Sequence, residues 1–157
     1  MSKAYDLLSE VSTMVSDNTP KQSGSIIFWR GKDSSIGFNL PAEGSGESAK
    51  KTVVANHSVI EMSDIPSATT IILNYRTAPN DPTVRSSITL RTTRRPASLT
   101  RTEYSYLLNT HKVGDFVPSA FGLEVIAKRD GPSPQADVKA DHQIDCLVTL
   151  SSSPPSA

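Results

Sequence analysis

Two stretches of this sequence alternate between apolar and polar residues, and this alternation most constrains the fold. In residues 69–76 the apolar side chains fall on odd positions, and in residues 84–93 on even positions: Ile71, Leu73 and Tyr75, then Val84, Ile88 and Leu90. Ile72 departs from the pattern. Because successive side chains of a strand point to opposite faces, each stretch predicts a half-buried strand. The turn-rich residues 77–83 between them predict antiparallel pairing.

Burying both apolar sets together places five polar side chains on one shared, exposed face: Asn74, Arg76, Arg85, Thr89 and Arg91. The net charge is zero, yet six of the eight arginines lie between positions 76 and 101. Arginine presents a planar fork of donors that suits phosphates, and it stacks on bases. We therefore predict that these five residues bind RNA. The alternative is a solvated strand face on which arginine serves solubility.

Apolar residues at helical spacing predict two amphipathic helices, over residues 3–16 and 99–112. Thr100 and Glu103 fit a capping box at the start of the second helix. Tyr104, Leu107 and Leu108 form one apolar stripe, and the chain has few other large apolar surfaces to cover it. We therefore predict that this stripe is the interface of a homodimer. His111 continues the stripe and is expected to be a packed histidine rather than a catalyst.

The fold class expected from these patterns is α+β: an antiparallel β-sheet meander with two amphipathic helices, dimeric. Further strands are expected at 25–30 and 35–40, which form a hairpin, and at 51–60, 121–128 and 143–151. Residues 1–150 are expected to form a single domain, with its parts at 1–18 (N-terminal helix), 24–93 (sheet), 99–112 (helix) and 121–150 (C-terminal strands). The Ser/Pro-rich residues 151–157 are expected to be disordered.

Composition argues against several classes of protein. Ser and Thr supply 37 of the 157 residues, which suits strands and turns. No apolar run approaches the ~20 residues that span a bilayer, and the first residues lack the apolar region of a secretory signal. We therefore expect no membrane partner. A single cysteine, Cys146, excludes an intrachain disulfide and suggests a reducing cytoplasm.

No motif for catalysis or metal binding is found in the sequence. The three histidines, His57, His111 and His142, are far apart and do not have metal-ligand spacing. Cys146 falls on the apolar positions of its strand, which is typical of a core thiol. We therefore predict that the chain is not an enzyme, with no catalytic residues, no cofactor, no metal and no small-molecule substrate.

The order of elements over roughly residues 24–112 resembles the coat proteins of small single-stranded RNA bacteriophages. The resemblance lies in a strand at 69–76, a second strand at 84–93, and the run from Arg95 to Thr100 leading into an amphipathic helix. It implies a structural capsid protein that forms an interlocked dimer, assembles into an icosahedral shell and binds viral RNA on an inner sheet face. It also implies a virion protein assembled in the host bacterial cytoplasm. The sequence departs from the family in its early helix and in its C-terminal strands.

The sequence is also compatible with other functions. One is an accessory structural protein of a tailed phage, for decoration, head completion or the tail. Another is a small jelly-roll coat protein, which normally has eight strands and often a basic N-terminal arm. We count about seven strands and no such arm. A small soluble enzyme is a weaker alternative.

Overall fold

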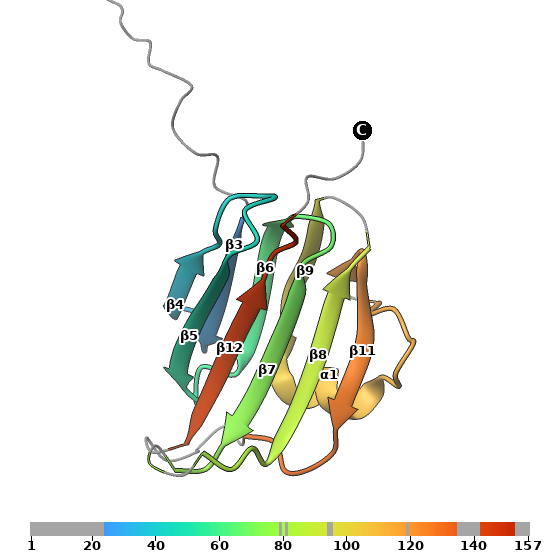
Figure 1. Cartoon of the computed structure of the whole chain (residues 1–157). Coiled ribbons are helices and arrows are strands. Elements are labelled where there is room, and N and C mark those ends of the chain that lie inside the picture. The colour runs from blue at the N-terminus through green and yellow to red at the C-terminus, as the bar shows by residue number, and fades with distance from the viewer. Residues whose placement is uncertain are drawn as a thin grey trace, which may run out of the picture.

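Two antiparallel sheets of five strands pack face to face (Figure 1). This computed structural model describes residues 24–78, 80, 82–93, 96–118, 120–134 and 142–152. The first sheet has the order β10 (Ala120–Phe121), β9 (Ala97–Glu103), β6 (Val59–Ile65), β3 (Ser25–Arg30), β4 (Ser34–Asn39). The second has the order β11 (Leu123–Arg129), β8 (Ser86–Thr92), β7 (Thr70–Arg76), β12 (Gln143–Thr149), β5 (Ser48–Val54).

The strands follow a two-stranded ribbon that winds around a common core. Strands β4, β5, β6 and β7 pair in turn with β3, β12, β9 and β8. This winding of eight strands into two sheets is that of a jelly roll, to which β10 and β11 are added. The ribbon is open between the end of β12 and the start of β3. Both ends lie against the loop after β4, because Leu40 N donates to Gly24 O and Gly46 N donates to Ser151 O.

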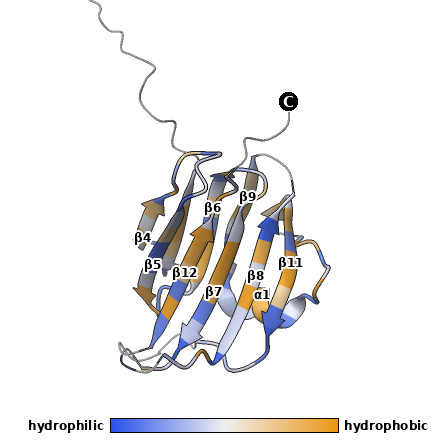
Figure 2. Cartoon of the chain, in the orientation of Figure 1, coloured by the Kyte–Doolittle hydropathy of each residue, from blue (hydrophilic) through white to orange (hydrophobic). Residues whose placement is uncertain are grey.

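The core lies between the sheets and is formed by the predicted apolar positions except Val84, which lies before β8 and is only partly buried. Ile71, Leu73, Ile88 and Leu90 are fully buried, and Tyr75 is nearly so. Figure 2 shows hydrophobic and hydrophilic residues following one another along β12, β7 and β8. The predicted antiparallel pairing of β7 with β8 is confirmed, as is the hairpin of β3 with β4. The alternation therefore predicted both the strands and their buried faces.

The predicted meander with two amphipathic helices is wrong. The described residues are mostly strand and hold a single short helix, α1 (Tyr104–Thr110). The chain does not meander, because β5 and β6, predicted as one strand over 51–60, are separated by a turn and belong to different sheets. The helix predicted over 3–16 lies outside the described residues. The α1 helix is too short to cross a membrane, and no other described segment is helical.

The helix predicted over 99–112 begins five residues later than expected. Residues 97–103 form β9, which pairs with β6 on one side and β10 on the other. The β-branched Thr100 and Thr102 favour this extended backbone, and pairing with β6, and with β10 at Ser98 and Leu99, satisfies hydrogen bonds of β9. The capping box is absent: Glu103 occupies the N-cap of α1 and no side chain caps the helix. Sheet pairing therefore overrides a local helix signal.

Candidate nucleic-acid interface

The outer face of the sheet β11-β8-β7-β12-β5 carries the predicted RNA-binding residues. Asn74 and Arg76 lie on β7, and Thr89 and Arg91 lie on β8. Their neighbours along each strand are buried, so all four share the outer face, as predicted. Arg85 is exposed just before β8, where its N–H donates to Tyr75 O at 2.8 Å. The structure therefore brings the five residues to one face, but it gives them different partners.

Arg76 is held in a largely buried ion pair with Asp145 of β12. Arg76 Nε donates to Asp145 Oδ2 at 2.6 Å and Arg76 Nη2 donates to Asp145 Oδ1 at 3.1 Å. The same Nη2 donates to Gln143 Oε1 at 2.7 Å, and Thr52 Oγ1 donates to Asp145 Oδ1 at 2.7 Å. The two charged side chains are 14% and 9% exposed. Arg76 is therefore part of the sheet's own structure, and it contributes charge and a fixed position to this face.

The pKa of Asp145 is shifted by this environment. Burial acts to raise the pKa of Asp145, because it disfavours the charged carboxylate. The hydrogen bonds from Arg76 and Thr52, with the charges of Arg76 and Lys50, outweigh burial and hold the pKa below its usual value. Asp145 is therefore a carboxylate at neutral pH and balances the charge of Arg76.

Arg91 and Arg85 are more accessible. Arg91 Nη2 lies 3.1 Å from Glu124 Oε1, with the arginine side chain 51% exposed. An exposed ion pair of this kind contributes only about 0–1 kcal/mol, so a phosphate can replace Glu124 as the partner. Arg85 is exposed, and its Nε donates to Thr77 Oγ1 at 3.3 Å.

Two adjacent hollows extend the site beyond the predicted residues. One, of about 590 Å³, is lined by Arg85 and by Arg129 of β11. The other, of about 280 Å³, is lined by Asn74, Arg76 and Lys50 of β5. Val84 lines both hollows, so they lie side by side.

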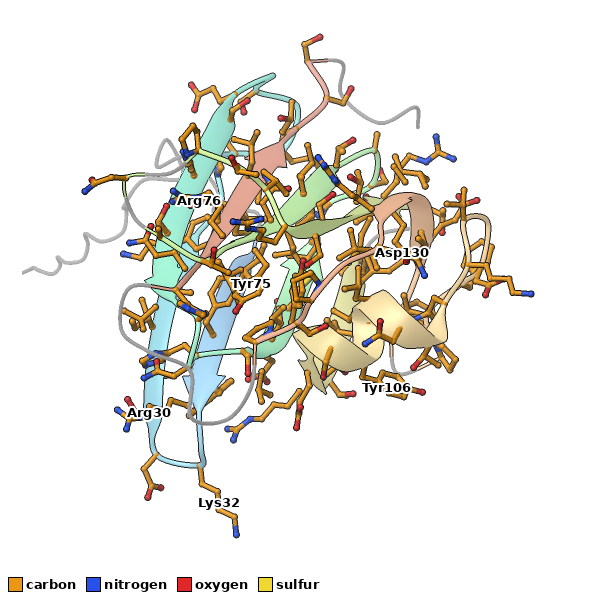
Figure 3. The ribbon with its side chains drawn as sticks, turned by 90° about the horizontal axis from the view of Figure 1, so that it is seen from below. Arg30, Lys32, Tyr75, Arg76, Tyr106 and Asp130 are labelled. Atoms are coloured by element: carbon orange, nitrogen blue, oxygen red, sulfur yellow. The ribbon has the colours of Figure 1, made fainter. Side chains whose placement is uncertain are left out.

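We call Lys50, Arg76, Arg85 and Arg129 the basic band. Figure 3 views the molecule from below. It labels Arg76 and Asp130, which follows Arg129 in the sequence, at separate places on this end of the sheet.

Close backbone packing supports the hollow between Arg85 and Arg129. A Cβ added at Gly131 would collide with the carbonyl oxygen of Arg85. Only glycine therefore lets the segment after β11 approach the start of β8 this closely. Pro132, next in that segment, accepts a hydrogen bond from Ser86 Oγ at 2.8 Å.

Lys50, Arg129 and Asp145 were not predicted as site residues from the sequence. The alternation of β12 does place Asp145 opposite the apolar Ile144 and Cys146. Nothing local indicates that β12 inserts between β7 and β5, or that β11 lies beside β8. These are pairings between distant segments, and they bring the extra residues to the site.

The predicted dimer-interface residues lie elsewhere. Tyr104, Leu107 and Leu108 are fully buried in the core of their own chain. The Tyr104 hydroxyl lies 3.0 Å from Ser86 Oγ, and burial raises the pKa of Tyr104 to about 12. The stripe was expected to need a second subunit, but the jelly roll of the same chain covers it. It therefore offers no surface to a partner in this fold.

His111 and Cys146 are buried, as predicted for packed residues. Burial raises the pKa of the Cys146 thiol well above its usual value, so the thiol is uncharged. Among the described residues, no group of three or more His, Cys, Asp or Glu side chains could hold a metal ion.

No protein family model, curated protein or solved structure matches this chain.

Proposed function

We propose that this chain is a structural coat protein that assembles with copies of itself into a closed shell and binds single-stranded RNA through the basic band. The observation that carries the RNA-binding part is the gathering of Lys50, Arg76, Arg85 and Arg129 on one sheet face from four strands or strand ends. Five strands spaced ~4.8 Å apart make this face ~19 Å wide, enough for several phosphates of an RNA strand.

The chemistry of the face favours a single-stranded nucleic acid. Arginine and lysine side chains contact phosphates, while the Asn74 amide is suited to hydrogen bonding with base edges. Phe116 is 58% exposed and pairs with Glu124, which in turn pairs with Arg91, so Phe116 lies along the β11 edge of this sheet. An exposed aromatic ring at the edge of a basic sheet provides a surface on which an unpaired base stacks.

The fold and the exposed apolar residues favour self-assembly. Double-sheet jelly rolls include viral capsid domains, lectins and cupins. Tyr106, Val113, Phe116 and Phe121 are 45–61% exposed, and all lie between the start of α1 and the end of β10. Exposed apolar surface of this kind is typical of contacts with other proteins. The virion is therefore the proposed location of the chain.

The proposal is tested by expressing the full chain and measuring particle size and nuclease-protected RNA. We expect closed particles that contain RNA. A monomer or small ring without RNA would contradict the proposal and favour an accessory structural protein.

The basic band is tested by replacing Arg85 and Arg129 together with serine. Both are exposed, whereas replacing Arg76 would leave Asp145 buried without its partner. The matched control replaces Arg30 and Arg101 with serine, which removes the same charge from the other sheet. We expect the salt dependence of RNA binding to fall by about 1.4 slope units in the band variant, at ~0.7 per lost phosphate contact, and to stay unchanged in the control. Equal RNA binding by both variants would remove the band from the proposed site.

A further inference from the structure

One edge strand of the described chain lacks protection against pairing with another strand. The sheets end at β10, β4, β11 and β5. β10 has only two residues, and β5 carries two adjacent lysines. The outer edge of β11 is covered by residues 114–117, since Gly114 N donates to Val125 O and Val117 N donates to Leu123 O. β4 has six residues with no charge and no proline, and within the described chain it pairs only with β3. Such an edge readily accepts another strand.

The hydrogen-bonding groups at this free edge can be assigned. Leu40 N donates to Gly24 O at 2.9 Å, in the same register that pairs β3 with β4. Because groups along an antiparallel strand point alternately to either side, the even-numbered residues of β4 bond to β3. The N–H and C=O groups of Ser35, Gly37 and Asn39 therefore point to the free edge. All three residues are exposed.

We propose that β4 pairs antiparallel with β4 of a second copy, about a twofold axis at Gly37, so that one sheet continues from subunit to subunit. If the sheet continues across the twofold axis, its inner face must meet the partner's inner face. Each residue of β4 must then pair with a partner residue whose side chain lies on the same face. Centring the axis on Gly37 satisfies this condition and pairs Ser35 with the partner's Asn39. The three outward-pointing residues of each copy then form the hydrogen-bonded pairs.

The side chains of β4 are complementary to themselves in this register. Ile36 and Phe38 are partly buried against the core, and each lies opposite the other in the partner. Aromatic and β-branched residues directly opposite each other stabilise antiparallel strands. Ser35 and Asn39 form polar pairs on the outer face, and Gly37 at the centre has no side chain to obstruct the approach. A self-complementary strand favours a second copy of this chain over an unrelated partner.

Charges at the two ends of β4 agree with this pairing. Arg30 ends β3, the turn before β4 carries Lys32 and Asp33, and Lys32 points away from the molecule at the hairpin tip (Figure 3). The proposed register brings the turn that holds Lys32 near the partner's loop after β4, which holds Glu43. The twofold axis places the same two opposite charges near each other at the other end of the paired strands. Opposite charges at an interface steer association and fix the register.

The inference deepens the proposed function, since it rests on self-assembly and names a contact, but the two are tested separately. Replacing Ser35 and Asn39 together with cysteine tests the register. The two cysteines would lie opposite each other across the interface, ~5.5 Å apart at their Cα atoms, within disulfide reach. Within one chain they are separated by ~13 Å and cannot bond. The native Cys146 is fully buried.

We expect mild oxidation to convert the S35C/N39C variant into a covalent dimer, while S35C alone, which faces a native asparagine, stays largely uncrosslinked. Equal crosslinking of the two variants would overturn the register. A dimer held together at another surface would give that result.

Lysines at the same two positions test the interface without a covalent crosslink. In S35K/N39K the new charges oppose each other, and we expect the dissociation constant measured by sedimentation to rise at least tenfold. The control N109K/T110K adds two lysines at exposed positions at the end of α1, away from β4, and is expected to dimerise normally. K32E is expected to weaken the dimer and K32E/E43K to restore it.

Several results would overturn the inference. The first is a monomeric wild-type chain, and the second is a dimer unaffected by S35K/N39K. The third is a β4 dimer seen only after removal of residues 1–22, because that result would place the chain's own N-terminal segment on this edge. Loss of RNA from the Arg85 and Arg129 variant with an intact dimer would locate RNA binding on the basic band. A β4 dimer that never assembles further and binds no RNA would overturn the coat function alone.

Discussion

Replacing Arg76 with methionine tests the buried ion pair that connects β7 to β12. The change removes both guanidinium contacts to Asp145 and leaves a carboxylate of 9% exposure with the Thr52 hydroxyl as its remaining described donor. Breaking a buried pair by removing one partner costs about 3–5 kcal/mol. We expect a loss near 3 kcal/mol in the free energy of unfolding at pH 7, at the low end because Arg76 retains 14% exposure.

The dependence of this loss on pH follows from the lowered pKa of the Asp145 carboxyl. The folded pKa of Asp145 lies below its unfolded value, so the pair stabilises the fold above the unfolded pKa. This stability is lost as the pH falls through the folded pKa. The difference between Arg76→Met and the wild type is therefore expected to shrink below about pH 4, since the unfolded carboxyl titrates near 3.9.

Urea unfolding at equal protein concentration, at pH 7 and at pH 3.5, measures both effects. Arg76→Met/Asp145→Leu is the matched control, because it replaces both charges with apolar groups and leaves no buried carboxylate. We expect the double variant to recover most of the lost stability at pH 7. A loss under 1 kcal/mol, a loss independent of pH, or a double variant no more stable than Arg76→Met would refute the reasoning.

Two further predictions concern the buried face of α1. Leu107→Ala is expected to lower the free energy of unfolding by about 2–5 kcal/mol at every protein concentration, because Leu107 is fully buried within its own chain; a loss that grows on dilution would place Leu107 between subunits instead. Tyr104→Phe is expected to cost about 1 kcal/mol by removing the bond to Ser86. The pKa of Tyr104 is raised to about 12, so its protonated form stabilises the fold below pH 10 and this stability falls as pH rises through 12. Tyr104→Phe is expected to flatten the decline between pH 10 and pH 12 in denaturant titrations, and an unchanged slope would contradict this assignment.

The helix at 99–112 shows how a local signal was misleading. Thr100 and Glu103 have the spacing of a capping box, yet both lie in β9. A capping box contributes on the order of 1 kcal/mol, whereas a seven-residue strand between two others satisfies many backbone groups at once. The stripe of Tyr104, Leu107 and Leu108 was correctly expected to be buried. What covers it could not be known from its spacing, because any apolar surface, in the same chain or another, satisfies it equally.

Residues 51–60 show the same limit for strands. Their apolar residues predicted one strand, and the structure divides them between β5 and β6 in opposite sheets. Alternation reports which side chains are buried, and both sheets of a sandwich bury one face of each strand. The sequence pattern is therefore the same whether the chain continues in one sheet or crosses to the other.

The sequence by itself determined the alternating strands, their buried faces, the two hairpins and the polar face that holds Asn74, Arg76, Thr89 and Arg91. These features depend on neighbours along the chain and on turns of a few residues, so local patterns specify them. Only the tertiary structure decided that β12 lies between β7 and β5 and that β11 lies beside β8. Those pairings brought Asp145 to Arg76, and Lys50 and Arg129 to the basic band. They depend on how the whole ribbon winds around its core, and no stretch of sequence encodes that winding locally.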